Sequence, residues 1–241
     1  MKCMIFAAGL GTRLGKITNR IPKALVKING KSLLRIAVEK CVSEGFDEII
    51  INIHHHPERM YEEVKRLKKM GYDINVSDET DLLLDTGGGL YKARNLFDDN
   101  PFLVYNVDIV TDISLKDLYN YHTQHDGLAT LLTRTRNGNR FLLVDDDNRL
   151  CGWCNKATDE KIISRDIPNL SEISFCGIHI ISPEIFSLMR YGVYSLTPLY
   201  LELAKTHDIY TYKDNSGYWF DVGTPEKLKE ARKALKSPEW F

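Results

Sequence analysis

The strongest constraint on this chain is the alternation of strand-like and helix-like segments through its first 134 residues. Short apolar stretches bounded by turn residues predict buried strands at 3–8, 48–53, 72–77, 102–106 and 128–134. Amphipathic patterns between these stretches predict helices after Ser32, at 57–70, near 90–97 and after Ser114. Strands that alternate with helices are typical of an open, mostly parallel, twisted α/β sheet.

The remainder of the sequence has a different pattern, richer in short strands. After residue 134 we expect a hairpin at 141–153, a strand at 172–181, helices at 183–189 and 196–206, a late strand pair at 209–213 and 218–221, and a last helix from Pro225. No repeat or linker interrupts the 241 residues. We therefore expect a single α/β domain.

Composition excludes several classes of function. The chain has 32 basic and 33 acidic residues, so it lacks the positive surplus of a general nucleic-acid binder. No apolar run is long enough to span a membrane, and the apolar stretch at 3–8 is short for the core of a signal peptide. Five scattered cysteines favour reduced thiols over a disulfide framework. We expect a cytoplasmic protein with no membrane or nucleic-acid partner.

The loop after the first strand is the most informative segment. Ligands of open α/β sheets bind at the carboxyl ends of the strands, and residues 7–13 here are Ala7-Ala8-Gly9-Leu10-Gly11-Thr12-Arg13. Glycines at this place allow backbone N–H groups to approach phosphate oxygens. The dinucleotide fingerprint needs glycine where Leu14 stands, and the Walker loop needs a Gly-Lys-Ser/Thr ending that is absent. Arg13 and the later Lys23 indicate a polyphosphate ligand instead.

These residues resemble the signature of the sugar-1-phosphate nucleotidylyltransferases. The segments 86–89, 106–108, 175–178 and 219–224 follow in the family's order, so the resemblance covers nearly the whole chain. The glycine triplet 87–89 and the short length look most like the N-acetylmuramate 1-phosphate uridylyltransferases of peptidoglycan recycling. The resemblance implies a Rossmann-like fold with helices on both faces of the sheet. Residues 1–134 would mainly bind nucleotide, and 135–241 would mainly bind sugar and supply a second metal carboxylate.

The reaction that the resemblance implies joins a nucleoside triphosphate to a sugar 1-phosphate and releases pyrophosphate. A phosphate monoester has a second pKa of about 6, so the attacking oxygen is mostly ionised at neutral pH and needs no general base. The obstacle is the approach of two anions, which positioning and charge neutralisation must overcome. Mg²⁺ suits this task because it binds carboxylates together with substrate phosphates.

The resemblance also implies roles for particular residues. Arg13 and Lys23 would hold the phosphates, and Asp108 and Asp221 would converge on one Mg²⁺ ion. The backbone of the loop from Ala7 to Arg13, with Gly87 and Gly88, would bind the base and ribose. Gly177, Asn155 and Lys156 would face the sugar. UTP and N-acetylmuramate 1-phosphate are the substrates we expect.

Several alternatives stay open. The same chemistry could serve glucose, mannose or heptose 1-phosphate, or choline phosphate. A non-catalytic sugar-nucleotide sensor is a further alternative, although such a protein is expected to lose one of the four charged residues, and this chain keeps all four. The run His54-His55-His56 suggests a metal site, but adjacent side chains diverge. Cys151 and Cys154 have thioredoxin-like spacing, but they lie in a predicted hairpin, where that motif would not open a helix.

Overall fold

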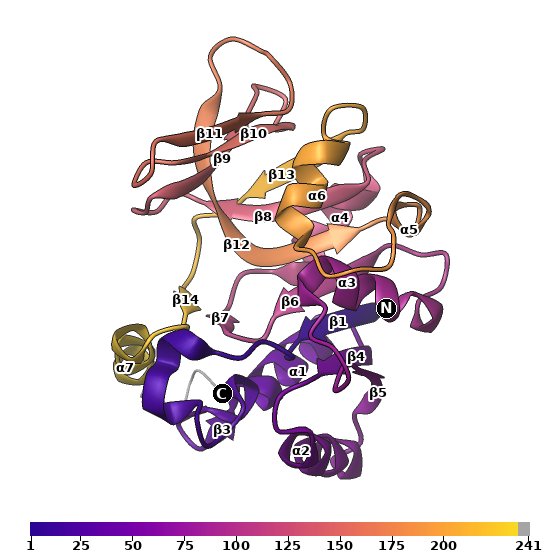
Figure 1. The fold of residues 1–241 in the computed structure, drawn as a ribbon, viewed down its shortest axis with the longest axis vertical. Coiled ribbons are helices and arrows are strands. Elements are labelled where there is room, and N and C mark those ends of the chain that lie inside the picture. Colours follow the sequence, from indigo (N-terminus) through magenta and orange to yellow (C-terminus); the bar gives the residue numbers. More distant parts are fainter. Residues whose placement is uncertain (236–241) are drawn as a thin grey trace. The chain divides into compact units, whose positions relative to one another are not determined.

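The structure is a computed structural model and describes residues 1–235 (Figure 1). Its elements group into two compact units. The first unit contains Met1–Asp85, Tyr105–Ile113 and the described residues from Gly217 onward, and the second contains Thr86–Val104 and Ser114–Ser216. The chain therefore alternates between the units, and neither unit corresponds to one half of the sequence.

The first unit is built on a parallel sheet. Its principal strands are β1 (Lys2–Phe6), β4 (Glu48–Ile53) and β5 (Asp73–Asp78), in the order β1-β4-β5. Its helices are α1 (Leu33–Ser43), α2 (Pro57–Lys69) and α7 (Pro225–Ala234). Two small antiparallel pairs complete it: β2 (Lys27–Ile28) with β3 (Lys31–Ser32), and β7 (Ile109–Thr111) with β14 (Trp219–Asp221). The parallel part agrees with the strand–helix alternation of the sequence.

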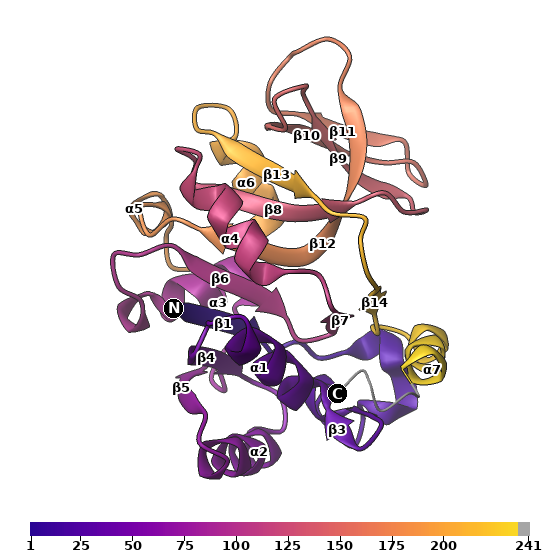
Figure 2. The ribbon, with the colours of Figure 1, turned by 180° about the vertical axis from the view of Figure 1, so that it is seen from behind.

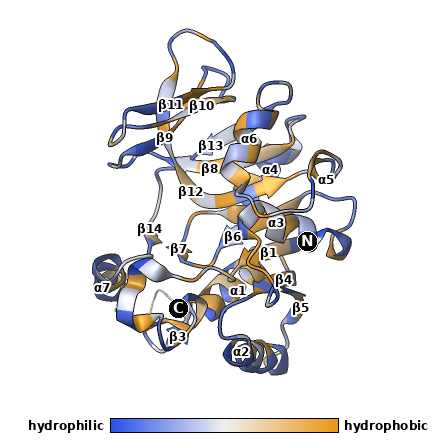
Figure 3. Cartoon of the chain, viewed as in Figure 1, coloured by the Kyte–Doolittle hydropathy of each residue, from blue (hydrophilic) through white to orange (hydrophobic). Residues whose placement is uncertain are grey.

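Local sequence explains why these elements form. The Ser32 side chain accepts a hydrogen bond from the Arg35 N–H and caps α1. Helix α2 begins at Pro57, which needs no N–H partner in the first turn, and it buries Met60, Val64 and Leu67 at helical spacing. Figure 3 shows that the rest of α2 is mostly hydrophilic. Apolar burial thus fixes the layers around the parallel strands.

The second unit contains a mixed sheet. Its strands are β8 (Ala129–Arg134), β9 (Arg140–Val144), β10 (Leu150–Asn155), β11 (Glu160–Ile163), β12 (Ser171–Ile181) and β13 (Ile209–Lys213). Its helices are α3 (Asp85–Lys92), α4 (Leu115–Thr123), α5 (Ile185–Leu188) and α6 (Leu196–Leu203). The long strand β12 pairs with both β8 and β9, and Figure 2 shows α4 lying against β8 and β12. Strand β6 (Phe102–Asn106) carries the chain from the second unit into the first.

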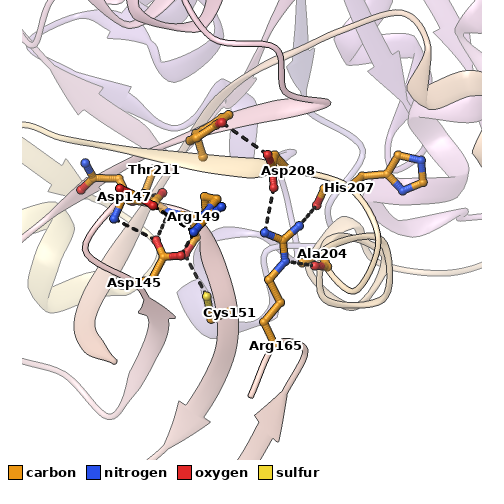
Figure 4. Close-up of polar contacts among 11 residues, drawn as sticks. Asp145, Asp147, Arg149, Cys151, Arg165, Ala204, His207, Asp208 and Thr211 are labelled. Atoms are coloured by element: carbon orange, nitrogen blue, oxygen red, sulfur yellow. Dashed lines mark hydrogen bonds and ion pairs between the residues drawn. The ribbon is translucent and has the colours of Figure 1, made fainter. Parts of the chain in front are cut away.

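A polar network fixes the loops of the second unit (Figure 4). The Arg165 guanidinium donates to the carbonyl oxygens of Ala204 and His207, at 2.5 and 2.8 Å, and pairs with the Asp208 carboxylate at 2.7 Å. In the hairpin turn, Asp145 accepts both the backbone N–H and the Nε–H of Arg149, each at 2.8 Å. These donors and acceptors are matched inside the protein, so the network is structural.

Two sequence expectations about local structure are wrong. The glycines at 87–89 lie inside α3 rather than in a loop that precedes a helix. The strands at 209–213 and 219–221 do not pair with each other, because β13 pairs with β8 and β14 pairs with β7. The strands β7 and β11 were not predicted: β7 has only three residues, and all four residues of β11 are exposed, so neither has a clear apolar period.

Candidate active site

The loop after β1 leaves a row of backbone donors available. The N–H groups of Ala7 and Ala8 are held by the Asn52 side-chain oxygen, at 2.7 and 3.3 Å. Beyond Gly9, the N–H groups from Leu10 to Arg13 donate to no acceptor within residues 1–235, and all four residues are at least partly exposed. Successive unsatisfied N–H groups in a glycine turn form a concave site for anions. This geometry suits the predicted phosphate-binding role of the loop.

Gly11 brings Lys23 against this loop. Gly11 has a left-handed backbone, with φ of +64°, and a Cβ there would fall 2.9 Å from the Lys23 Cβ. Lys23 begins a short 3₁₀ helix directly after Pro22. Its ammonium group forms an ion pair with the Asp108 carboxylate, and the two side chains are 15% and 12% exposed. A glycine with a left-handed backbone at position 11 therefore lets the predicted catalytic residue Lys23 pack against the loop.

The pairing of β7 with β14 brings the two predicted metal carboxylates onto adjacent backbone segments. Asp221 lies opposite Ile109, the residue after Asp108. The Val222 N–H also donates to the Asp108 carbonyl oxygen at 2.9 Å. Residues far apart in the sequence thus meet through a short antiparallel ladder.

Asp221 is surrounded by cationic and N–H donors. Its carboxylate accepts from the Gly223 N–H at 2.9 Å and from the Lys227 ammonium at 2.7 Å. The Arg13 guanidinium lies beside it, because a Cβ at Gly223 would fall 2.7 Å from Arg13 Nη2 and 2.8 Å from Asp221 Oδ1. Burial alone would raise the pKa of Asp221. Hydrogen bonds and charge from Lys227, Gly223 and Arg13 outweigh burial, so the pKa of Asp221 lies below its ordinary value.

The structure therefore brings Arg13, Lys23, Asp108 and Asp221 together in the first unit, and their roles in binding and catalysis stay predictions. Lys227 joins them and gives the cluster three cations and two carboxylates. Cations beside a row of free N–H groups can bind a polyphosphate, and two carboxylates can bind a hard cation. Within residues 1–235 no group of three or more His, Cys, Asp or Glu side chains is arranged as a metal site. A cation here would thus need further oxygens from the substrate.

Sequence analysis missed Lys227. The signal was present, because Pro225 was predicted to start a helix, and Lys227 lies in the first turn of that helix. The Thr224 hydroxyl accepts the Lys227 N–H at 3.4 Å, and Pro225 follows this cap directly. The helix start therefore places the lysine near the residue that ends β14.

Gly87 and Gly88 lie in the second unit and contact its own backbone. Both N–H groups donate to the Tyr194 carbonyl oxygen, at 2.8 and 3.2 Å. A Cβ at Gly87 would overlap the Tyr194 ring. Close packing of α3 against Tyr194 thus gives a structural reason for glycine at position 87. Nucleotide binding by these two residues stays a prediction.

The predicted sugar-binding residues also lie in the second unit. Gly177 has φ of +75° and occupies an irregularity of the β8–β12 ladder between Phe175 and His179. Asn155 ends β10, is buried, and accepts the Ala157 N–H through its side-chain oxygen at 3.2 Å. The Lys156 ammonium pairs with Glu172 at 2.5 Å, which raises the pKa of Lys156. Asn155 and Lys156 share a pocket that does not include Gly177, and that pocket also contains several carboxylates.

A second pocket, with a volume of about 490 Å³, lies in the same unit. Three aromatic residues, two arginines and two hydroxyl residues are among those that line it: Phe141, Trp153, Phe175, Arg136, Arg140, Ser195 and Thr197. Arg140 lies opposite Asn155 in the β9–β10 ladder. Its guanidinium has no hydrogen-bond or ion-pair partner among the described residues. Aromatic rings with a free guanidinium suit a sugar that carries an anionic group.

The alternative sites receive little support from the geometry. Cys151 donates to the Arg149 carbonyl oxygen at 3.4 Å, whereas the Cys154 thiol lies near Glu172. Burial is the main cause that raises the pKa of both thiols, whereas a redox pair needs a lowered pKa. The ring centroids of His55 and His56 lie 4.0 Å apart, and no metal cluster includes these residues in the described part of the chain.

None of the helices within residues 1–235 is both long enough and apolar enough to cross a lipid bilayer.

Solved structures with a similar backbone support the fold class. A putative glucose-1-phosphate thymidylyltransferase from Bacillus anthracis has a TM-score of 0.80, covering 98% of this chain and 96% of its own at 18% identity. A UDP-glucose pyrophosphorylase solved with UDP-glucose has a TM-score of 0.78, covering 98% of both chains at 20% identity. The predicted α/β nucleotidyltransferase fold is thereby confirmed.

Sequence comparison identifies the family. The mannose-1-phosphate guanyltransferase of Kluyveromyces lactis is 27% identical over 236 residues, covering 94% of this chain and 62% of that protein. The chain thus spans less than two thirds of the length of this relative. The narrower likeness to N-acetylmuramate 1-phosphate uridylyltransferases stays a prediction. The model of the family described as nucleotidyl transferase matches residues 2–237, and because this match covers nearly the whole chain, the protein belongs to the nucleotidyl transferase family.

Proposed function

We propose that this protein transfers a nucleoside monophosphate from a nucleoside triphosphate to a sugar 1-phosphate. The observation that carries the proposal is the meeting of Arg13, Lys23, Asp108 and Asp221 beside the free N–H groups of the loop after β1. Family membership supports the same chemistry. A sensor without catalytic function would have no need for this complete charged set.

The chain's own residues account for the electrostatics of the step. An oxygen of the sugar phosphate attacks the α-phosphorus, the bond from that phosphorus to the bridging oxygen breaks, and pyrophosphate leaves with the electron pair. Arg13 and the N–H groups from Leu10 onward hold the triphosphate and stabilise the departing pyrophosphate. Lys23 neutralises charge at the reacting phosphates when its ammonium is released from Asp108. No residue needs to remove a proton, since the acceptor is already mostly ionised.

Asp108 and Asp221 fit a Mg²⁺ ion by the chemistry of their donors. Both supply carboxylate oxygens, and the β7–β14 ladder brings their backbones together. Mg²⁺ bound there with substrate phosphates would reduce their negative charge. Before the ligands bind, Lys23 and Lys227 pair with the two carboxylates and orient them.

UTP and N-acetylmuramate 1-phosphate are the substrates that we propose first. N-acetylmuramate carries a carboxylate in addition to its phosphate. The pocket with three aromatic residues and the unpartnered Arg140 supports an acceptor of this kind. The sugar-binding roles of Gly177, Asn155 and Lys156 and the nucleotide-binding roles of Gly87 and Gly88 are part of the same proposal, as is a cytoplasmic location.

Guanylyl transfer to mannose 1-phosphate is the second candidate. It is supported by the similarity to mannose-1-phosphate guanyltransferases, of which the Yarrowia lipolytica protein is 29% identical over 233 residues. Mannose has no carboxylate, so this candidate gives Arg140 no anionic group on the sugar to bind. The two candidates therefore differ in what they predict for Arg140.

Pyrophosphate release with Mg²⁺ tests the proposal. Four nucleoside triphosphates are combined with N-acetylmuramate, N-acetylglucosamine, mannose and glucose 1-phosphates. We expect one strong pair, and we expect Asp108→Asn and Asp221→Asn to lower its turnover by about 10²–10³-fold. Silence across the panel despite nucleotide binding would favour the sensor.

Arg140→Gln then distinguishes the acceptors. If N-acetylmuramate 1-phosphate is the acceptor, its KM rises by about tenfold or more, since a charged hydrogen bond is lost. The slower reaction with N-acetylglucosamine 1-phosphate, which lacks the carboxylate, is unchanged. An equal effect on both sugars would remove the case for an anionic substituent.

A further inference from the structure

Glu79 is a fully buried carboxylate with no role in the proposed chemistry. It follows β5, and its side chain has 0% exposure. Oε1 accepts a hydrogen bond from the Asn52 side-chain nitrogen at 2.8 Å, and Oε2 accepts from the Leu84 N–H at 3.3 Å. Burying a carboxylate is costly unless hydrogen bonds compensate it. These two hydrogen bonds offset part of that cost and connect the carboxylate to Asn52 and to the segment after β5.

Asn52 connects Glu79 to the loop after β1. It is 3% exposed and lies near the end of β4. Its side-chain oxygen accepts the N–H groups of Ala7 and Ala8, and its nitrogen donates to Glu79. The three segments meet because β1, β4 and β5 are parallel neighbours in register. The carboxyl ends of these strands therefore lie at the same edge of the sheet.

The polarity of this connection is set by the loop and by Glu79 together. The two N–H groups of the loop need an acceptor, so the side-chain oxygen of Asn52 faces them. The NH₂ of Asn52 then faces Glu79, whose Oε1 accepts a hydrogen bond from it. A reversed amide would place donors against donors at the loop and an oxygen against the carboxylate. Glu79 thus holds the Asn52 amide, and the amide holds the N–H groups of Ala7 and Ala8.

We propose that Asn52 and Glu79 are positioning residues for the triphosphate. They fix the N–H groups of Ala7 and Ala8 toward the protein interior, so that the next residues turn outward with their own N–H groups free for phosphate oxygens. The inference rests on the proposed function, because it takes the loop from Leu10 to Arg13 as the triphosphate site. Neither residue touches substrate.

We call the hydrogen-bonded chain from Glu79 through Asn52 to Ala7 and Ala8 the relay. Exchanging the carboxylate and the amide between positions 79 and 52 tests it. In Asn52→Asp, the new carboxylate still accepts from the loop but faces the carboxylate of Glu79. In Glu79→Gln, the new amide can satisfy Asn52 or Leu84 but not both. In the double variant N52D/E79Q, the carboxylate at position 52 accepts from the loop and from the amide nitrogen at position 79, while the amide oxygen at position 79 accepts the Leu84 N–H. The double variant also restores the net charge of the pair.

Two measurements follow the relay separately. In the ligand-free protein, the amide NMR signals from Leu10 to Arg13 should shift in each single variant and return toward wild type in the double variant. In kinetics with the best substrate pair, each single variant should raise the KM for the nucleoside triphosphate by about tenfold or more while leaving the KM for the sugar 1-phosphate unchanged. The double variant should recover most of this loss.

The exposed substitutions Asn75→Asp and Glu62→Gln are matched controls, because both side chains lie on the surface of the same unit. They should change neither the loop signals nor the KM values. The relay is overturned if the double variant is as impaired as the sum of the single variants, or if the single variants leave the loop signals unchanged. If the wild-type protein has no transferase activity, the proposed function fails, but the ligand-free NMR result still decides whether the relay positions the loop.

Discussion

Two regions of the molecule, the network around Arg149 and Arg165 in the second unit and the loop after β1 in the first, use their polar groups in different ways. In the second unit, Arg165 and Arg149 direct their donors to carbonyl oxygens and carboxylates of the same unit (Figure 4). In the first unit, the N–H groups from Leu10 to Arg13 have no acceptor among the described residues, while cations and carboxylates gather beside them. Polar groups matched within the protein stabilise the fold, whereas groups left unmatched at a constrained surface can bind a ligand.

Removal of one carboxylate from each unit should show this contrast most strongly. Asp108→Asn in the first unit should lower kcat by about 10²–10³-fold, because a charge that organises the transition state is lost. Glu202→Gln in the second unit breaks only an exposed pair with Lys205 and should leave kcat unchanged. Steady-state pyrophosphate release measures both variants, and equal losses would remove the functional distinction between the units.

The buried His122 of the second unit should make the free energy of unfolding fall in acid. Burial, with a smaller contribution from His125, lowers the pKa of His122 from 6.5 to about 4. The unfolded chain therefore binds the proton first, and stability that is complete above pH 6.5 is lost as the pH falls toward 4. The expected loss is about 3 kcal/mol.

Urea unfolding of wild type and His122→Gln between pH 7 and pH 4 checks this expectation. Glutamine can partner Thr130 and Ser182, which bind the two ring nitrogens at 3.0 Å each, but it does not titrate. The stability of the variant should therefore depend less steeply on pH. Parallel curves for the two proteins would contradict the assignment.

Two glycines of the loop after β1 should differ in their tolerance of a side chain. Gly11→Ala adds a Cβ to a left-handed residue and places it 2.9 Å from the Lys23 Cβ. We expect a loss of about 1–3 kcal/mol in the free energy of unfolding, with a lower kcat because Lys23 moves. Gly9→Ala has no heavy atom within 4 Å of the new Cβ and should stay within about 0.5 kcal/mol of wild type. Urea unfolding and pyrophosphate release measure both variants, and equal stability of the two would contradict the account of Gly11.

The smallest effect should come from the pair Lys227–Asp221. The pKa of Asp221 lies below its ordinary value of 3.8, so the pair contributes stability above pH 3.8 that disappears as the pH falls through the lowered pKa. In urea unfolding, Lys227→Gln should be less stable than wild type at pH 7 and should match it in strong acid. Lys205→Gln, which breaks an exposed pair of the second unit, should leave stability unchanged at either pH.

Sequence patterns predicted features whose cause is local. The strand Glu48–Ile53, the caps at Ser32 and Ser114 and the helix from Pro57 follow from apolar period, capping residues and proline position. Arg13 and Lys23 were recognised as phosphate ligands from the loop itself, whereas the shared role of Asp108 and Asp221 was implied by the resemblance to a family. From the sequence alone, this resemblance was the only reason to expect the two aspartates to lie together.

Features that depend on contacts between distant segments were not predicted. Strand β7 has three residues, which is too short for a periodic signal, and its pairing with the predicted strand β14 joins segments more than 100 residues apart. Asn52 and Glu79 look like ordinary polar residues near strand ends, and only the register of β1, β4 and β5 brings them together. The glycines of α3 disfavour a helix, but their close contact with Tyr194 stabilises one.

Amide NMR with the donor nucleotide tests the central claim most directly. The ¹H–¹⁵N signals of the ligand-free protein are compared with those after saturation with UTP, or with the triphosphate selected by the activity panel, and Mg²⁺. We predict the largest shifts at the N–H groups from Leu10 to Arg13, because these donors gain phosphate acceptors. Saturable binding that leaves these four signals unchanged would contradict the assignment of the loop as the triphosphate site.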